Sequence, residues 1–182
     1  MEAVTTLPWS RALQRADLAR MPDDGHRYEL VDGTLIVTPA PSPRHQTAVL
    51  ALARLLSDRC PTDCQVFVAP LEVVLADDTV LQPDVIVARR ADLTDRDLPA
   101  PPVLAVEVTS PSTRRVDLTL KRSRYEAVRC PSFWVVDPDA PSLTARELRA
   151  TTYEEVAHVV GEQRYDATTP YEVTVCPAQL IA

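Results

Sequence analysis

The sequence has little glycine and few aromatic residues. Three of its 182 residues are glycine, and Phe, Trp and Tyr together make up 5%. Its 17 prolines mark the breaks between short elements. An apolar content of 46% with 25% charged residues excludes an intrinsically disordered chain. We therefore expect residues 1–182 to form a single domain with its own core, and residues 1–14 to be a loosely ordered N-terminal arm.

The sequence also lacks segments typical of export or membrane insertion. Residues 1–20 contain no basic start followed by an apolar stretch. No apolar run is long enough to cross a bilayer. We expect a soluble cytoplasmic protein that does not contact a membrane.

The cysteines do not form the two pairs of closely spaced ligands from which a structural zinc site is usually built. Cys60 and Cys64 are close together, but Cys130 and Cys176 stand alone. This spacing favours buried or free thiols over a zinc site.

Positive charge is in short supply. The formal net charge of −7 argues against a broad, non-specific coating of nucleic acid, because neutralising phosphates needs a positive face. A local basic patch is still compatible with the sequence. One stretch holds most of the candidates, with two acids among them: Arg114, Arg115, Lys121, Arg122, Arg124 and Arg129, beside Asp117 and Glu126. Taken alone, the arginines fit an ordinary solvated helix face equally well.

The hydrophobic pattern predicts an α/β or α+β domain with helices packed on a central mixed sheet. Asp32-Gly33 between alternating apolar runs predicts an N-terminal hairpin, in which Glu29 pairs with Ile36. A short helix is expected over 15–21, and strands over 66–75, 82–88, 103–108, 132–136, 143–148, 153–160 and 173–175, the pair 143–148 and 153–160 forming an outer hairpin.

Two longer helices are expected between these strands. Ser42-Pro43 is a typical helix start, and the following helix has one inward stripe spaced by four, three and four: His45, Val49, Leu52 and Leu56. A histidine in that position is more often a packing or capping residue than a catalyst. The second helix, over 114–128, has an inward stripe of Leu118, Lys121, Tyr125 and Val128.

Three charged residues on adjacent elements stand out as candidates for chemistry. Glu107 is the one acid inside an apolar strand, so it needs a partner: a basic side chain, a shared proton or a cation. Asp84 follows Pro83 at the start of another covered strand, and Lys121 is carried inward by its helix. Two carboxylates with an ammonium are enough to hold a divalent metal such as Mg²⁺ against a phosphate.

Each of these residues also has an ordinary structural explanation. Pro83-Asp84 is common turn chemistry. Glu107 fits a buried ion pair with an arginine. Lys121 could form an exposed pair with Asp117, one helical turn away.

Taken together and in order, several motifs resemble those of the Uma-two type restriction endonucleases, within the PD-(D/E)XK, or restriction-endonuclease-like, superfamily. The resemblance runs from about residue 15 to the C-terminus. It is carried by Tyr28-Glu29-Leu30-Val31-Asp32-Gly33, Ser42-Pro43-Arg44-His45, Gln82-Pro83-Asp84, Glu107-Val108-Thr109-Ser110-Pro111-Ser112-Thr113, Lys121 with Tyr125, and Phe133-Trp134-Val135-Val136-Asp137-Pro138.

This resemblance implies a nuclease core of a central mixed sheet flanked by helices. It implies that Asp84 and Glu107 bind Mg²⁺ or Mn²⁺, that Glu29 is a further acid, and that the substrate is DNA. The position two after Glu107 is Thr109 where the superfamily has lysine, so the lysine role passes to Lys121 on the helix.

The substrate-binding residues expected from this reading are His45, Tyr125, Arg114 and Arg115. His45 would contact a phosphate or carry a proton, and Tyr125 would donate a hydrogen bond.

Two further readings stay open. One is a catalytically inactive binding module that kept the nuclease fold, which the acidic balance and Thr109 favour. The other is the same chemistry on RNA, which no residue distinguishes because the sequence has no aromatic stacking platform. Cleavage of both strands of a duplex would favour a homodimer, although no sequence feature marks an interface.

Overall fold

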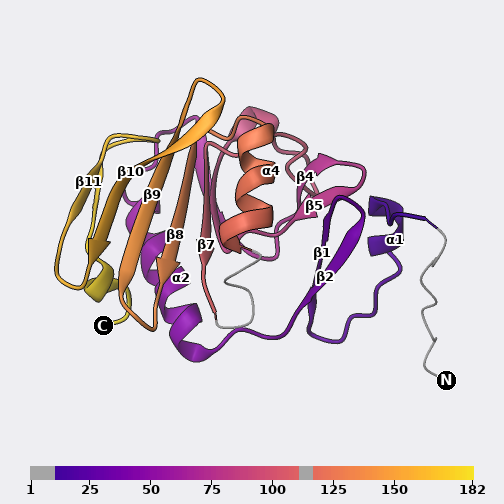
Figure 1. Ribbon diagram of the computed structural model, residues 1–182, viewed down its shortest axis with the longest axis horizontal. Helices are drawn as coiled ribbons and strands as arrows, with labels where there is room; N and C mark the ends of the chain where they lie inside the picture. The colour runs from indigo at the N-terminus through magenta and orange to yellow at the C-terminus, as the bar shows by residue number, and fades with distance from the viewer. Residues whose placement is uncertain (1–10, 111–116) are drawn as a thin grey trace.

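A six-stranded mixed sheet forms the centre of the molecule (Figure 1). The computed structural model describes residues 11–110 and 117–182. The strand order is β10-β9-β8-β7-β6-β3, with β7 and β8 parallel and the other neighbours antiparallel. The strands are β3 (Cys64–Val68), β6 (Val85–Arg89), β7 (Leu104–Val108), β8 (Ser132–Asp137), β9 (Ser142–Arg149) and β10 (Thr152–Val160).

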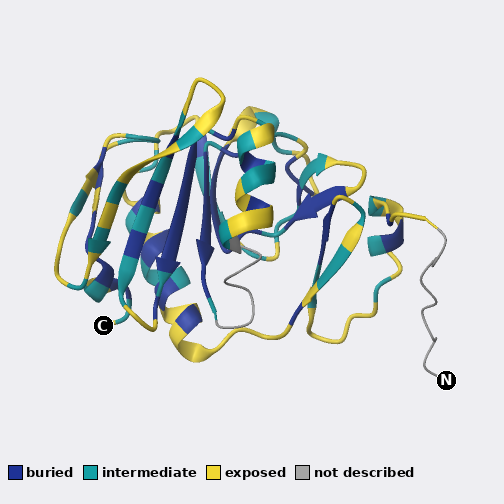
Figure 2. Cartoon of the chain, in the orientation of Figure 1, coloured by how far each residue is buried: buried dark blue, intermediate teal, exposed yellow. Residues whose placement is uncertain are grey.

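The middle strands are buried because both faces of the sheet are covered, as their continuous apolar runs predict. All five residues of β7 and the first five of β8 are buried, and Figure 2 shows them as the darkest part of the sheet. Successive residues of a strand point to opposite faces. In β8, Trp134 and Val136 therefore pack on one side, and Phe133 and Val135 on the other.

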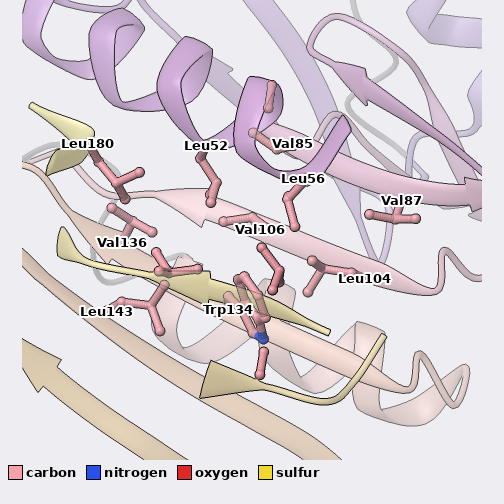
Figure 3. Close-up of a cluster of buried hydrophobic side chains, with 14 of the residues drawn as sticks. Leu52, Leu56, Val85, Val87, Leu104, Val106, Trp134, Val136, Leu143 and Leu180 are labelled. Atoms are coloured by element: carbon pink, nitrogen blue, oxygen red, sulfur yellow. The ribbon is translucent and has the colours of Figure 1, made fainter. Parts of the chain in front are cut away.

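Helix α2 (Pro43–Ser57) covers the first of these faces. It begins as its sequence predicts: the Ser42 hydroxyl accepts a hydrogen bond from the His45 amide at 3.2 Å, and proline occupies the first turn. Leu52 and Leu56 are fully buried and pack against Val106 and its neighbours, the cluster drawn in Figure 3. This cluster is the main core of the fold.

Helix α4 (Arg122–Ala127) covers the opposite face, where Tyr125 packs against Phe133 with ring centroids 5.5 Å apart (Figure 1). The expectation of one regular α-helix over 114–128 is only partly met. A π-helical turn, η2 (Asp117–Lys121), precedes α4, and residues 111–116 lie outside the described part of the chain. Such turns often occur at functional sites because they rotate the residues that follow them.

A second, four-stranded sheet lies beside the first, in the order β2-β1-β5-β4. Its hairpin has the predicted register, including Glu29 opposite Ile36, around a turn at Asp32 and Gly33. Val31 and Leu81 pack into the cluster under α4 and so join the two sheets. The strands are β1 (Arg27–Val31), β2 (Thr34–Thr38), β4 (Val73–Ala76) and β5 (Thr79–Leu81).

The remaining elements are short. They are α1 (Arg15–Leu18), the hairpin of β11 (Tyr165–Ala167) and β12 (Val173–Val175), and the 3-10 turns η1 (Arg90–Asp92) and η3 (Pro177–Leu180). Leu13, within the expected N-terminal arm, is buried, and its amide donates to the Gly33 carbonyl at 3.0 Å. All four cysteines are free thiols, and all except the half-buried Cys60 are buried. Within the described residues, no helix is long and apolar enough to span a membrane.

Candidate active site

Lys121 lies between two buried carboxylates. Its Nζ is 2.9 Å from Oε2 of Glu29 and 3.2 Å from Oε2 of Glu107. All three residues are at most 3% exposed. Glu107 therefore has a basic partner, as its place in an apolar strand predicts, and the ammonium of Lys121 points inward, as its place on the helical stripe predicts.

Three separate elements bring these groups together. Glu29 comes from β1, Glu107 from the middle strand β7, and Lys121 from the last position of the π-helical turn. Tyr125, one turn further along, donates its hydroxyl to Oε1 of Glu107 at 3.4 Å. Burial, with the charges of Glu107 and Glu29, raises the pKa of Tyr125 well above its usual value, so this hydroxyl stays a donor at neutral pH.

Asp84 is the third carboxylate, and it is held by groups from three other elements. Oδ1 accepts a hydrogen bond from Nη1 of Arg27 at 2.8 Å. Oδ2 lies 3.2 Å from Nε2 of His45 and accepts from the Val108 amide at 2.8 Å. Burial opposes ionisation of Asp84, but His45, Arg27 and Val108 together hold its pKa below the usual value. Asp84 is therefore a carboxylate at neutral pH.

Asp84 and Glu107 lie next to the last paired position of β6 and β7. Val85 of β6 pairs with Val106 of the antiparallel β7, and Asp84 directly precedes β6. The Val108 amide donates to Oδ2 of Asp84, so the carboxylate of Asp84 reaches the backbone next to Glu107. The two acids predicted as metal ligands thus come from the same edge of the sheet.

The hairpin sheet is tied to the same place through the segment before β6. The Gln82 amide donates to Oε1 of Glu29 at 2.7 Å, and Nη1 of Arg27 contacts the Gln82 carbonyl at 3.4 Å. Because Arg27 and Glu29 are two apart on β1, they point to the same side of the strand. That side faces Asp84 and Lys121.

The described residues of this cluster carry charges of both signs. Asp84, Glu29 and Glu107 are acids, and Arg27 and Lys121 are the basic side chains that pair with them. Buried charges of this kind need close partners, because leaving one of them unpaired is costly.

The donor set suits a hard divalent cation only in part. Within the described ranges, no three His, Cys, Asp or Glu side chains are grouped so as to hold a metal ion. The oxygens of Asp84 and Glu107 do fit the coordination preference of Mg²⁺. This ion usually binds one or two carboxylates and completes its octahedral coordination with water and phosphate oxygens. Both carboxylates are paired with Arg27, His45 and Lys121, so an ion would have to displace or share these contacts.

The structure brings together six of the eight residues expected from the sequence to form the site: Glu29, His45, Asp84, Glu107, Lys121 and Tyr125. The other two, Arg114 and Arg115, lie outside the described residues. Arg124 of the expected basic patch instead pairs with Asp32 at 3.0 Å, and Arg122 and Arg129 are exposed.

Sequence reasoning missed two contributors, Arg27 and the backbone of Gln82. A signal for Arg27 exists, because it shares one strand face with Glu29.

Lys121 has a further signal in the sequence. It is the single lysine, whereas the other 18 of the Lys and Arg residues are arginines. An ammonium can lose a proton when it is buried and a guanidinium cannot. Lysine at this one buried position therefore stands apart from the arginine-rich remainder.

Residues 15–175 match the model of the Uma2 family, described as "Putative restriction endonuclease". The chain belongs to this family. Membership places it among proteins with a restriction-endonuclease-like fold, and the family's description points to nucleic acid as the class of substrate. No curated protein matches the sequence significantly.

A solved structure supports the fold independently. The chain is similar to a protein from Anabaena variabilis that is described as a "putative nuclease", with a TM-score of 0.71 and 15% sequence identity. The likeness covers 93% of this chain and 97% of the other. At this identity it bears on the fold alone, and it agrees with the α+β architecture with a central mixed sheet.

Proposed function

We propose that the protein is a metal-dependent endonuclease that hydrolyses phosphodiester bonds in DNA. The observation that carries this proposal is the contact of Lys121 with both Glu29 and Glu107, next to Asp84. Family membership makes nucleic acid the expected substrate. Burying an ammonium between acids costs free energy of desolvation, and apolar packing would serve a mainly structural role as well.

Asp84 and Glu107 are the residues that would hold Mg²⁺ or Mn²⁺. When bound, such an ion lowers the pKa of a coordinated water and neutralises charge that develops on the phosphate. Lys121, fixed by Glu29, provides an ammonium that can orient the attacking water and stabilise the phosphorane oxygens. Tyr125 keeps Glu107 oriented, and His45 is placed beside Asp84 to exchange a proton with the leaving group or contact a phosphate.

Cleavage of a DNA panel with Mg²⁺ or Mn²⁺ tests the proposal. Glu107→Gln keeps the size of the side chain and removes its charge, so cleavage should fall by about 100-fold or more. Glu154→Gln, an identical change at an exposed position of β10, should cleave as the parent does. Equal activity of the parent and Glu107→Gln would refute the enzymatic role.

A second candidate is a binding module that kept the fold without the chemistry. The observation in its favour is that resident cations already pair with both predicted metal ligands, together with Thr109 at the usual lysine position. Calorimetry with Mn²⁺ separates the two candidates. Micromolar binding that is lost in Asp84→Asn supports the nuclease, and absence of binding supports the module.

A homodimer is a conditional part of the proposal. One such site attacks one strand, so cleavage of both strands of a duplex would favour a homodimer. Sedimentation of the protein with and without duplex DNA measures this directly.

A further inference from the structure

A cavity opens directly beside Asp84. It encloses about 370 Å³, within the usual range for small-molecule sites, and its walls come from α2, the start of β1 and the end of β3. Asp84, His45 and Arg27 form its polar end, and it therefore adjoins the candidate active site. The side chain of Arg27 is 18% exposed, so its guanidinium is accessible to a bound group.

The rest of the cavity is apolar. Val49 and Pro70 line it, and Leu50 and Val68 also contribute, although they are 71% and 44% exposed and rank among the exposed large hydrophobic side chains. Gln46 adds one exposed amide. Exposed apolar residues that gather around a cavity beside a polar site typically mark a ligand.

We propose that this cavity binds one nucleobase of the DNA strand whose phosphate lies at Asp84 and Glu107. This inference rests on the proposed function and names its substrate more closely. A base has two flat apolar faces and a polar edge, and one sugar joins it to its phosphate. The cavity lining offers a group for each part: apolar side chains to contact the faces of the base, Gln46 to hydrogen-bond its edge, and Arg27 to contact the phosphate.

The consequence concerns the form of the substrate. A base within a duplex is stacked on both faces, so apolar side chains cannot enclose it without unstacking it. A single strand, a flap or a frayed end presents such a base without that cost. The protein is thus a nuclease that prefers unpaired DNA.

Binding measurements with modified strands test the cavity separately from catalysis. A short single-stranded oligonucleotide is compared, by fluorescence anisotropy, with one of equal length in which every nucleotide is abasic. Both are titrated in EDTA and again in Ca²⁺. The phosphate charge is the same, so the bases account for the difference, which should be about 5-fold or more in favour of the base-containing strand because the abasic strand lacks the apolar contact.

Two matched double variants complete the experiment. Leu50→Ala/Val68→Ala removes the exposed apolar walls without changing charge, and should reduce the preference for bases to less than about 3-fold. Val156→Ala/Val160→Ala truncates two exposed apolar residues on the distant strand β10, and this variant should keep the preference for bases. Equal binding of the abasic strand, failure to bind either strand, or an unchanged preference in Leu50→Ala/Val68→Ala would overturn the cavity assignment. So would a dimer that this variant dissociates, because the cavity would then be an interface between copies.

The outcome is independent of the nuclease test. A preference for bases without cleavage would support the cavity and refute the enzyme. Cleavage without that preference would support the enzyme and refute the cavity assignment.

Discussion

Lys121 is the residue at which the two sheets and the helix layer meet, because its ammonium contacts acids from β1 and β7. Its position could be predicted from helical spacing, since Leu118, Lys121 and Tyr125 recur at steps of three and four. Glu107 and Asp84 were predicted in the same way, as charged exceptions within or beside apolar strands. Arg27 escaped prediction because its one signal, the strand face that it shares with Glu29, does not by itself show that this face meets Asp84. The partners and their distances depend on packing between remote segments.

Removing the ammonium should destabilise the fold. Lys121→Met leaves Glu29 and Glu107 buried without their shared cation, so we expect unfolding in urea to lose about 3–5 kcal/mol. Adding Glu29→Gln to this variant should recover part of the loss, because one carboxylate no longer needs a counter-charge. Arg122→Met, at the exposed neighbouring position, is the control and should change stability little. A loss below about 1 kcal/mol in Lys121→Met would show that the carboxylates find other partners.

Arg27 should compete with a metal for Asp84. Its Nη1 occupies Oδ1 of that carboxylate, so Arg27→Gln frees one ligand atom and removes one nearby positive charge. We expect calorimetry to show Mn²⁺ bound about 10-fold more tightly by Arg27→Gln than by the parent. Arg146→Gln, which changes a similarly buried arginine of β9 paired with Glu155, should leave the affinity as it was. Weaker binding in Arg27→Gln would mean that the arginine orients Asp84 for the ion.

The elements that could be predicted best are those with a long pattern or a specific turn. The hairpin register follows from Asp32-Gly33, and α2 begins where Ser42-Pro43 indicates. The three-residue strands β5 and β11 were missed, whereas the equally short β12 was predicted, because three residues show too little of a period to decide. The predicted helix over 114–128 contains a π-helical turn instead of regular α-helix up to Lys121, and spacing alone cannot distinguish the two when the inward residues are the same.

The cap of α2 should affect both stability and the site. Ser42→Ala removes the acceptor for the His45 amide, so we expect a loss of about 1 kcal/mol in urea or thermal unfolding. His45 then has a less fixed backbone beside Asp84, and cleavage should also fall. Thr47→Ala, which removes an exposed hydroxyl one turn further along, serves for comparison. Equal stability of the parent and Ser42→Ala would indicate that proline alone defines the helix start.

At the scale of the whole molecule, an acidic protein has to bind an acidic polymer. The net charge of −7 leaves room for few phosphate contacts, and the described site offers Arg27 and Lys121 as cations close to the carboxylates. The affinity should therefore depend on base contacts and on a divalent ion more than on extended charge neutralisation.

The salt dependence of DNA binding measures this balance. Each neutralised phosphate of a single strand contributes a slope of about −0.7 to log K against log salt, so we expect a total slope no steeper than about −3. Fluorescence anisotropy over a series of KCl concentrations, at constant Ca²⁺, determines it. A slope steeper than about −5 would reveal a basic surface away from the site.

The lone lysine makes the protein unusually simple to label. Reagents that acylate primary amines can react with only Lys121 and the chain terminus, and burial protects Lys121 from them. Its acylation rate, read by intact-mass spectrometry, would therefore report how often the gap between the two acids opens to solvent.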